Sequence, residues 1–222
     1  MAYQKLQVSR AILVIPSNDT DIPFPGAIYL ESTTTGNAAN KLIDVLESGT
    51  NSTSGTTLTD AAKNFITAGV QVGDTVEDTT SGDLATITAV GVNTLTLDTD
   101  IFPVVARPYS LGSFIRLGVK PGDIIYNYDS SEATTVTNVD SGTQLSVTLA
   151  GGITTANKYK LYKSGQNNGC ILYVGAKGNL SVLTIGGDEV IYVAVPDGTF
   201  MPVQMLRVNS TSTTATDIIA QW

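Results

Sequence analysis

The stretch FITAGVQVGD at residues 65–74 returns as FIRLGVKPGD at residues 114–123. The two copies lie 49 residues apart, because Phe114 corresponds to Phe65. The similarity continues downstream, where Tyr109 corresponds to Tyr159 after a one-residue insertion. Similarity at a fixed offset marks a repeated structural unit. The chain therefore contains two copies of one module.

Each copy alternates apolar and polar residues in short runs, a pattern typical of half-buried β-strands. In the first copy such runs lie at residues 84–90 and 94–97. Before them, residues 60–68 begin with an N-cap candidate and continue with helix-forming residues, which predicts one or two helical turns. We predict two tandem small β-modules, repeat 1 over residues 50–111 and repeat 2 over residues 112–167.

A Gly-Asp pair stands at the same place in both copies, as Gly73-Asp74 and Gly122-Asp123. The pair can be interpreted as a ligand loop or as a turn. Glycine supplies the positive φ that a turn needs, and aspartate accepts hydrogen bonds from nearby backbone amides. Neither copy has the glycine-rich run and lysine of a phosphate-binding loop. The pattern therefore favours a turn.

The residues that flank the repeats also predict short strands. Strands are expected at residues 11–15, 27–30, 171–174, 180–184, 189–195, 201–208 and 215–222, mostly separated by Gly-, Pro- or Asp-containing turns. Successive short strands with frequent turns indicate a sandwich or barrel. We predict an all-β fold with an antiparallel β-sandwich or barrel built from both chain ends, into which the two modules are inserted.

The outer domain is predicted to comprise residues 1–30 and 168–222, and residues 31–49 are expected to form a connector. Within the connector, residues 38–46 fit either a short helix or a strand, and the strand is preferred. Two chain ends can complete one domain while the inserted body leaves and returns through a surface loop.

The composition excludes several classes of function. The chain has 222 residues, no histidine and one cysteine, so histidine-based catalytic triads, histidine-ligated zinc and intrachain disulfides are ruled out. A net charge of −8 argues against nucleic acid as a partner. No apolar stretch approaches the roughly 20 residues of a membrane helix, so no membrane partner is expected. We predict no enzyme activity and no cofactor.

Two pairs of carboxylates have one-residue spacing, Asp19 with Asp21 and Asp98 with Asp100. Such spacing places both oxygens in one turn or on one strand face, which suits calcium. The same residues also fit ordinary turn carboxylates. The sequence leaves a structural calcium open.

The aromatic residues offer a second possible site. Tyr126 and Tyr128 lie on one face of a predicted strand, where they either pack across strands or, together with Tyr109, form a platform for sugar stacking. Cross-strand packing is the preferred interpretation. Cys170 begins a predicted strand, and we expect it to be buried and inert.

Four apolar residues near the C-terminus are candidates for a subunit interface. Trp222 is the only tryptophan and the last residue, so it either closes the base of the outer domain or anchors a neighbouring subunit. Met201 and Met205 share one strand face, where core packing is the preferred interpretation and a soft interface is the alternative. Phe200 lies beside them.

Both chain ends resemble a known family. The N-terminal stretch PSNDTDIP at residues 16–23 and the C-terminal stretches LYVG at 172–175, VPDGTFMPVQ at 195–204 and TTATDIIAQW at 213–222 are similar to the spike-base family of tailed phages and phage-like gene-transfer particles. The resemblance covers about a third of the chain. It implies a component of the virus particle that sits on a capsid or tail, and it brings no catalytic residues.

These observations together predict a virion structural protein, made in the host cytoplasm. We expect a capsid decoration or a base for a spike or fibre, which assembles through contacts with itself, the major capsid protein or other virion proteins. The alternatives are a neck or tail adaptor and a carbohydrate- or receptor-binding fibre module. Low charge on strand edges favours pairing with other chains, and oligomers of this kind are usually symmetric.

Overall fold

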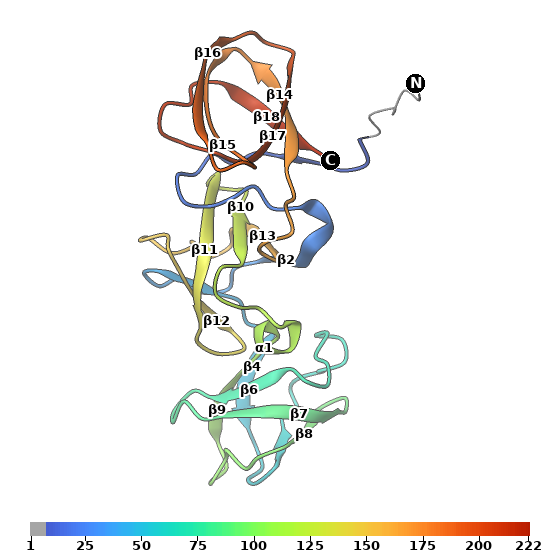
Figure 1. Ribbon diagram of the computed structural model, residues 1–222. Helices are drawn as coiled ribbons and strands as arrows, with labels where there is room; N and C mark the ends of the chain where they lie inside the picture. Colours follow the sequence, from blue (N-terminus) through green and yellow to red (C-terminus); the bar gives the residue numbers. More distant parts are fainter. Residues whose placement is uncertain (1–7) are drawn as a thin grey trace. The chain divides into compact units, whose positions relative to one another are not determined.

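The computed structural model describes residues 8–222 and confirms the all-β prediction. About 47% of the chain is strand and 3% is helix, and the strands form three antiparallel six-stranded sheets (Figure 1). Residues 1–7 of the predicted outer domain lie outside the described residues. We call the three sheets outer, middle and inner, according to how the chain passes through them.

The outer sheet is built from both ends of the chain and forms a nearly closed barrel. Its strand order is β1-β18-β14-β17-β15-β16. The strands are β1 (Ala11–Leu13), β14 (Cys170–Ala176), β15 (Gly178–Thr184), β16 (Glu189–Val195), β17 (Thr199–Val208) and β18 (Thr216–Gln221). Because successive side chains of a strand point to opposite faces, every second residue of these strands enters the barrel core.

The inner sheet holds the first repeat, in the order β4-β9-β6-β7-β8-β5. Its strands are β4 (Glu47–Asn51), β5 (Thr57–Thr59), β6 (Thr75–Asp78), β7 (Leu84–Val90), β8 (Thr94–Leu97) and β9 (Arg107–Gly112). The stretch at 61–69 forms hydrogen-bonded turns where helical turns were expected, with the amide of Ala68 donating to the carbonyl of Asn64.

The middle sheet holds the second repeat, in the order β2-β13-β10-β11-β12-β3. Its elements are β2 (Ile28–Thr33), β3 (Lys41–Ile43), α1 (Phe114–Leu117), β10 (Ile124–Asn127), β11 (Glu132–Val139), β12 (Gln144–Val147) and β13 (Lys158–Tyr162), and the short 3-10 helix η1 (Pro25–Ala27) precedes them. The chain enters the middle sheet through β2 and β3, completes the inner sheet, and then returns to the middle sheet. The three sheets are therefore nested insertions.

This nesting gives a role to residues 31–49, which were expected as a connector. They contain the end of β2, all of β3 and the start of β4. The strand alternative for residues 38–46 is the observed one, at β3. Leu42 of β3 pairs with Leu145 in the middle sheet as Leu58 pairs with Leu95 in the inner sheet. Each repeat thus needs two strands upstream of its most similar segment.

The two sheets share their register in detail. Val76 pairs with Ala85 and Leu111, and the equivalent Ile125 pairs with Thr134 and Leu161. The ladder slips at the same place in both, between Ile87 and Ala89 and between Val136 and Asn138. Such a β-bulge bends and twists the strand that carries it. The repeat in the sequence therefore corresponds to a repeat in backbone structure.

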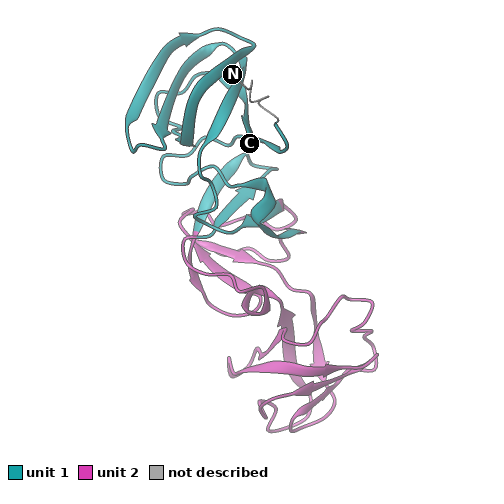
Figure 2. Cartoon of the chain, turned by 45° about the vertical axis from the view of Figure 1, so that its right-hand side comes forward, with its two compact units in different colours: residues 1–31, 123–135, 159–222 teal, residues 32–122, 136–158 magenta. Residues whose placement is uncertain are grey.

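The chain divides into two compact units, each with its own hydrophobic core (Figure 2). Unit 1 comprises residues 1–31, 123–135 and 159–222, and unit 2 comprises residues 32–122 and 136–158. Unit 1 contains the barrel together with β10 and β13, and unit 2 contains the inner sheet. Within residues 8–222, the structure has no helix that is long and apolar enough to span a membrane.

Candidate interaction surface

Two of the four predicted interface residues are part of the barrel core. Met205 is fully buried and Met201 is 6% exposed, because both side chains point inward from β17. The Cys170 thiol donates a hydrogen bond to the carbonyl of Met205 at 3.3 Å. The preferred core interpretation therefore describes both methionines, and neither can offer a surface to a partner in this structure.

Trp222 is held within unit 1. Its indole Nε1 donates to Oδ1 of Asn167 at 3.1 Å, and its ring meets the ring of Phe24 edge to face, with centroids 5.6 Å apart. The side chain is half-buried and packs against the barrel core. The indole N–H has a hydrogen-bond acceptor and the ring has an aromatic neighbour, as expected for a tryptophan that closes the base of the outer domain.

Phe200 is the one predicted interface residue that stands out from the barrel, with 57% of its surface exposed. Its ring lies 5.1 Å from the ring of Tyr173 on the neighbouring strand β14. Tyr173 pairs in turn with Ile219 on β18, and Ile219 pairs with Leu13 on β1, which is 52% exposed. Four apolar side chains thus form a continuous row across four adjacent strands.

A second row lies beside the first on the same outward face. It consists of Ala11, Gln221, Ile171 and Pro202, with Ala11 paired to Gln221 and Gln221 paired to Ile171. We define the barrel face as these eight residues: Ala11, Leu13, Ile171, Tyr173, Phe200, Pro202, Ile219 and Gln221. None of the eight is charged. An uncharged apolar centre is typical of the buried core of a protein interface.

The structure favours packing over the alternative of a tyrosine platform for sugars. Tyr126 and Tyr109 are 0% and 2% exposed, and only Tyr128 is half-buried. The Tyr126 ring lies 6.1 Å from Tyr128 and 6.0 Å from Tyr162, in edge-to-face contacts. Tyr109 donates to the Asp60 carboxylate at 2.9 Å. These aromatic rings pack inside the protein, so the sugar-stacking interpretation of these residues is wrong.

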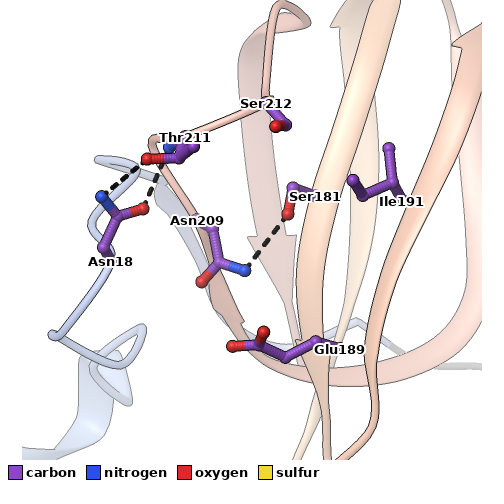
Figure 3. A pocket seen from close by; sticks show the side chains of 7 residues that line it. All are labelled: Asn18, Ser181, Glu189, Ile191, Asn209, Thr211 and Ser212. Atoms are coloured by element: carbon purple, nitrogen blue, oxygen red, sulfur yellow. Dashed lines mark hydrogen bonds between the residues drawn. The ribbon is translucent and has the colours of Figure 1, made fainter.

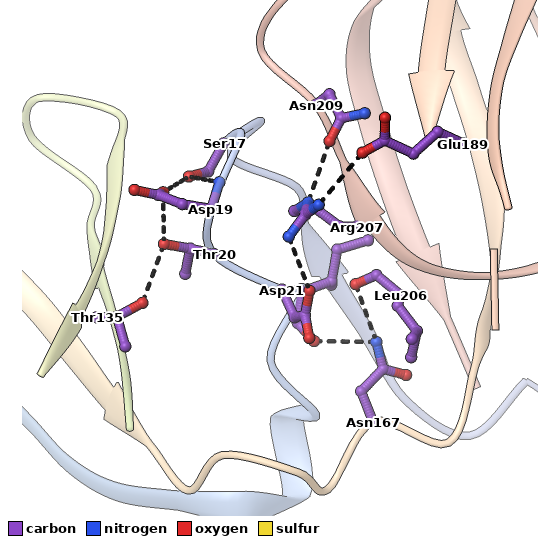
Figure 4. A network of polar contacts seen from close by, with 11 residues as sticks. Ser17, Asp19, Thr20, Asp21, Thr135, Asn167, Glu189, Leu206, Arg207 and Asn209 are labelled. Atoms are coloured by element: carbon purple, nitrogen blue, oxygen red, sulfur yellow. Dashed lines mark hydrogen bonds and ion pairs between the residues drawn. The ribbon is translucent and has the colours of Figure 1, made fainter. Parts of the chain in front are cut away.

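A polar network joins the N-terminal segment to the barrel wall (Figure 4). At its centre, Nε of Arg207 donates to Oδ1 of Asn209 at 3.0 Å. The two terminal guanidinium nitrogens lie 3.6 Å from carboxylate oxygens of Asp21 and Glu189. Burial raises the pKa of Asp21 above its ordinary value, and the charge of Arg207 partly opposes this rise. Through Arg207, the network links Asp21 of the N-terminal segment to strand β17 of the barrel.

Beside this network the barrel wall holds an open pocket of about 360 Å³ (Figure 3). It is lined by Asn18, Ser181, Glu189, Ile191, Asn209, Thr211 and Ser212. Two hydrogen bonds join Asn18 to Thr211, and Asn209 donates to Ser181 at 3.2 Å. Glu189 leaves carboxylate oxygens exposed beside the aliphatic side chain of Ile191. No feature of the sequence had singled out this pocket.

Three of the four carboxylates in the one-residue-spaced pairs accept hydrogen bonds from the chain itself, and the fourth, Asp21, pairs with Arg207. Asp19 accepts from the hydroxyl of Ser17 at 2.7 Å. Asp98 accepts from the amide of Thr86 at 2.7 Å, and Asp100 accepts from the amide of Phe102 at 3.0 Å. Among residues 8–222 no group of three or more His, Cys, Asp or Glu is placed to hold a metal ion. The structure thus places these carboxylates in turn and loop contacts.

Cys170 lies in the barrel core, 1% exposed. Burial raises the pKa of its thiol to about 12, an effect that the hydrogen bond with Asn167 only partly offsets. A thiol with this pKa is protonated at neutral pH, and the thiolate is the reactive form. The expectation of a buried, inert cysteine agrees with this environment.

No family model, no curated protein and no solved structure matches this chain.

Proposed function

We propose that this chain is a structural protein of a virus particle, which assembles through protein–protein contacts of its barrel. The observation that supports the proposal most strongly is the barrel face. It carries no charge in a chain of net charge −8, and Phe200 and Leu13 expose more than half of their surface there. Contiguous exposed apolar patches with polar surroundings mark interaction sites.

The proposed position is that of a capsid decoration or of a base for a spike or fibre, with the barrel as the attached part. The proposed partners are further copies of the chain, the major capsid protein and other virion proteins. An acidic chain is repelled by packaged nucleic acid, which favours a place on the exterior. A neck or tail adaptor would use the same face and remains the nearest alternative position.

The proposal includes no catalysis. The chain has no histidine to serve as a general base near neutral pH. Asp98 and Asp100 each accept a hydrogen bond from a backbone amide. We therefore assign the chain a role in binding and assembly.

The test is to purify intact particles from cells that make this chain and to locate it in them by electron microscopy and mass spectrometry. We expect a fixed copy number per particle. Phe200→Asp should lower incorporation at least about 10-fold, since a buried charge is costly in an apolar interface. Val193→Asp is the control, because Val193 is 74% exposed on β16, outside the barrel face. Absence of the unaltered chain from particles would refute the proposal.

A receptor-binding role is a second candidate, supported by the pocket of Figure 3. Its amide and hydroxyl groups, the exposed Glu189 carboxylate and the aliphatic Ile191 suit a neutral sugar, which needs both hydrogen bonds and an apolar contact. Glycan-array binding that is lost in Glu189→Gln would support this role. An array on which the unaltered chain binds no glycan would exclude it for the glycans displayed.

A further inference from the structure

We propose that the Asn168-Gly169 pair is a site of spontaneous covalent modification, at which the chain converts Asn168 into isoaspartate and aspartate. It is the only Asn-Gly pair in the sequence. The pair lies in the loop between β13 and β14, outside the barrel face, so the modification does not depend on the proposed function.

The reaction needs an asparagine, the backbone amide that follows it, and water. The deprotonated amide nitrogen of Gly169 attacks Cγ of Asn168, and the carbon–nitrogen bond of the side-chain amide breaks. Ammonia leaves with the equivalent of the proton lost from the backbone nitrogen, and a five-membered succinimide ring remains. Water then opens this ring. Hydrolysis at the side-chain carbonyl gives aspartate, and hydrolysis at the main-chain carbonyl gives isoaspartate, so no oxidant or reductant takes part.

The local structure leaves this pair able to react. Asn168 is exposed to the water that the reaction consumes, and within residues 8–222 its side chain makes no hydrogen bond that would restrain its rotation toward Gly169. Gly169 has a φ of 98°, and an added Cβ would lie 3.0 Å from Cβ of Gln204, so the fold requires glycine at this position. Glycine also offers the least steric hindrance to ring closure, because it has no side chain.

Asn37 provides a comparison within the same chain. It is also exposed, and in the part of the chain that the structure describes its side chain makes no hydrogen bond. The next residue is Ala38, whose methyl group hinders attack by its own amide nitrogen. The two asparagines are thus alike in exposure and differ in the residue that follows. We expect conversion at Asn168 to be at least about 10-fold faster than at Asn37.

The modification has a structural consequence, because the attacking nitrogen is held by Asn167. The Gly169 amide donates to Oδ1 of Asn167 at 2.9 Å, and the same oxygen accepts from Nε1 of Trp222 at 3.1 Å. Nδ2 of Asn167 donates to the carbonyls of Ile22 at 3.0 Å and Leu206 at 3.4 Å (Figure 4). Ring closure removes the hydrogen of the Gly169 amide, and isoaspartate then lengthens the main chain by one carbon atom. The modified chain therefore loses a hydrogen bond that orients Asn167 toward Trp222.

The experiment incubates the freshly purified full-length chain at neutral and mildly alkaline pH in heavy-oxygen water and follows Asn168 and Asn37 by peptide mass spectrometry. We expect isoaspartate and aspartate at residue 168, each carrying heavy oxygen from the water that opened the ring. The rate should rise about 10-fold per pH unit, because the attacking species is the deprotonated amide. Trp222 is the only tryptophan, so its fluorescence reports on its contact with Asn167 and should change with the same half-time as the conversion.

Asn168→Ala is the matched variant. It keeps Gly169 and the hydrogen bond to Asn167 but has no side-chain amide to lose, so the modification and the fluorescence change should both be absent. The proposal is overturned if Asn168 converts no faster than Asn37, or if aspartate forms without isoaspartate. Conversion with no change in Trp222 fluorescence, or with an equal change in the variant, would overturn the structural consequence. Each of these results leaves the proposed function standing.

Discussion

The inner and middle sheets share one backbone arrangement but differ in their side chains. Both have six strands in the same order, the same bulge, and glycines at positive φ in the same turn, where Gly69 and Gly118 have φ of 80° and 73°. The two sheets differ in the side chains at equivalent positions. The inner sheet has an ion pair whose carboxylate is buried, whereas the equivalent position of the middle sheet is an amide. The comparison shows that hydrogen-bonding geometry was retained while charge was exchanged.

The buried pair of the inner sheet is Asp78 and Arg107. The Asp78 side chain is fully buried and accepts from Nε of Arg107 at 2.6 Å and from the amide of Thr80 at 2.9 Å. In the middle sheet the equivalent residue is Asn127, which accepts from the amides of Asp129 and Ser130. Both sheets thus have the same turn, but the carboxylate of Asp78 is replaced by the neutral amide of Asn127. By the same alignment, Asn157 replaces Arg107.

A second difference concerns volume. In the inner sheet Thr75 pairs with Gly112, and in the middle sheet Ile124 pairs with Tyr162. Gly112 has no room for a side chain, because an added Cβ would overlap the carbonyl of Gly142. Tyr162 is 2% exposed and belongs to the core of unit 1. The same register position therefore serves a close backbone approach in one sheet and core packing in the other.

The largest effect should come from Tyr162→Ala. We expect it to lower the free energy of unfolding by about 3–5 kcal/mol, because it empties a core site. Tyr162→Phe should cost only about 1 kcal/mol, since it removes the hydroxyl that lies 3.2 Å from the hydroxyl of Tyr128. Urea unfolding followed by tyrosine fluorescence measures both. Equal costs for the two variants would contradict core packing at this position.

The opposite change, Gly112→Ala, should cost about 3 kcal/mol by overpacking, because backbone rather than a flexible side chain occupies the space. Gly151→Ala is the matched control, since an added Cβ there meets no atom within 4 Å. Its cost should stay within about 0.5 kcal/mol. If Gly112→Ala were as harmless as the control, the two sheets would not differ in volume at this position.

The charge difference predicts a smaller, pH-dependent effect. Arg107→Asn should cost about 2 kcal/mol at pH 7, because it leaves the Asp78 carboxylate buried without its cation. Asp78→Asn combined with Arg107→Asn copies the middle sheet, and should recover more than half of that loss. Thermal melts of the two variants and the unaltered chain make the comparison. A double variant that is less stable than the single one would show that the two sheets are not interchangeable here.

The pH dependence has a definite sign. Burial by itself would raise the pKa of Asp78, but the hydrogen bonds from Arg107, Thr80 and Ser81 outweigh it and hold the pKa below its ordinary value of 3.8. A folded-state pKa below the unfolded one stabilises the protein above the unfolded value, and this stabilisation is lost as the pH falls through the folded value. The unaltered chain should therefore lose stability below about pH 4 more steeply than the double variant.

The smallest effect tests what the two sheets share. Gly69→Ala and Gly118→Ala each force alanine into a left-handed conformation with no steric contact within 4 Å. Each should cost about 1 kcal/mol, and the two costs should agree within about 0.5 kcal/mol. Paired thermal melts check the agreement. A clear inequality would mean that the two turns are held differently.

The all-β class, the repeat and the outer domain made from both chain ends were predicted from the sequence alone. These features are local or periodic: alternation along 84–90, the Gly-Asp pairs and the offset between Phe65 and Phe114 are all visible in a single chain. The turn interpretation of Gly73-Asp74 agrees with the structure, in which Gly73 has a φ of 92° and Asp74 accepts from the amide of Gln71.

The candidate site was only partly visible in the sequence. Phe200 was singled out, but its neighbours in the row, Leu13, Tyr173 and Ile219, come from three other strands. A single sequence shows which residues alternate, and it does not show which strands pair. Met201 and Met205 share a strand face, and the barrel decided that this face points inward.

What the sequence determined by itself is the set of strands and the repetition of one module, because strand periodicity and turn chemistry are set by residues close together in the chain. Only the tertiary structure decided the nesting and the apolar row on the barrel. In the nesting, the chain forms β2 and β3 of the middle sheet, completes the inner sheet, and then returns to finish the middle sheet. The physical reason is that strand pairing joins distant segments through backbone hydrogen bonds, which are common to all residue types and leave little trace in the sequence.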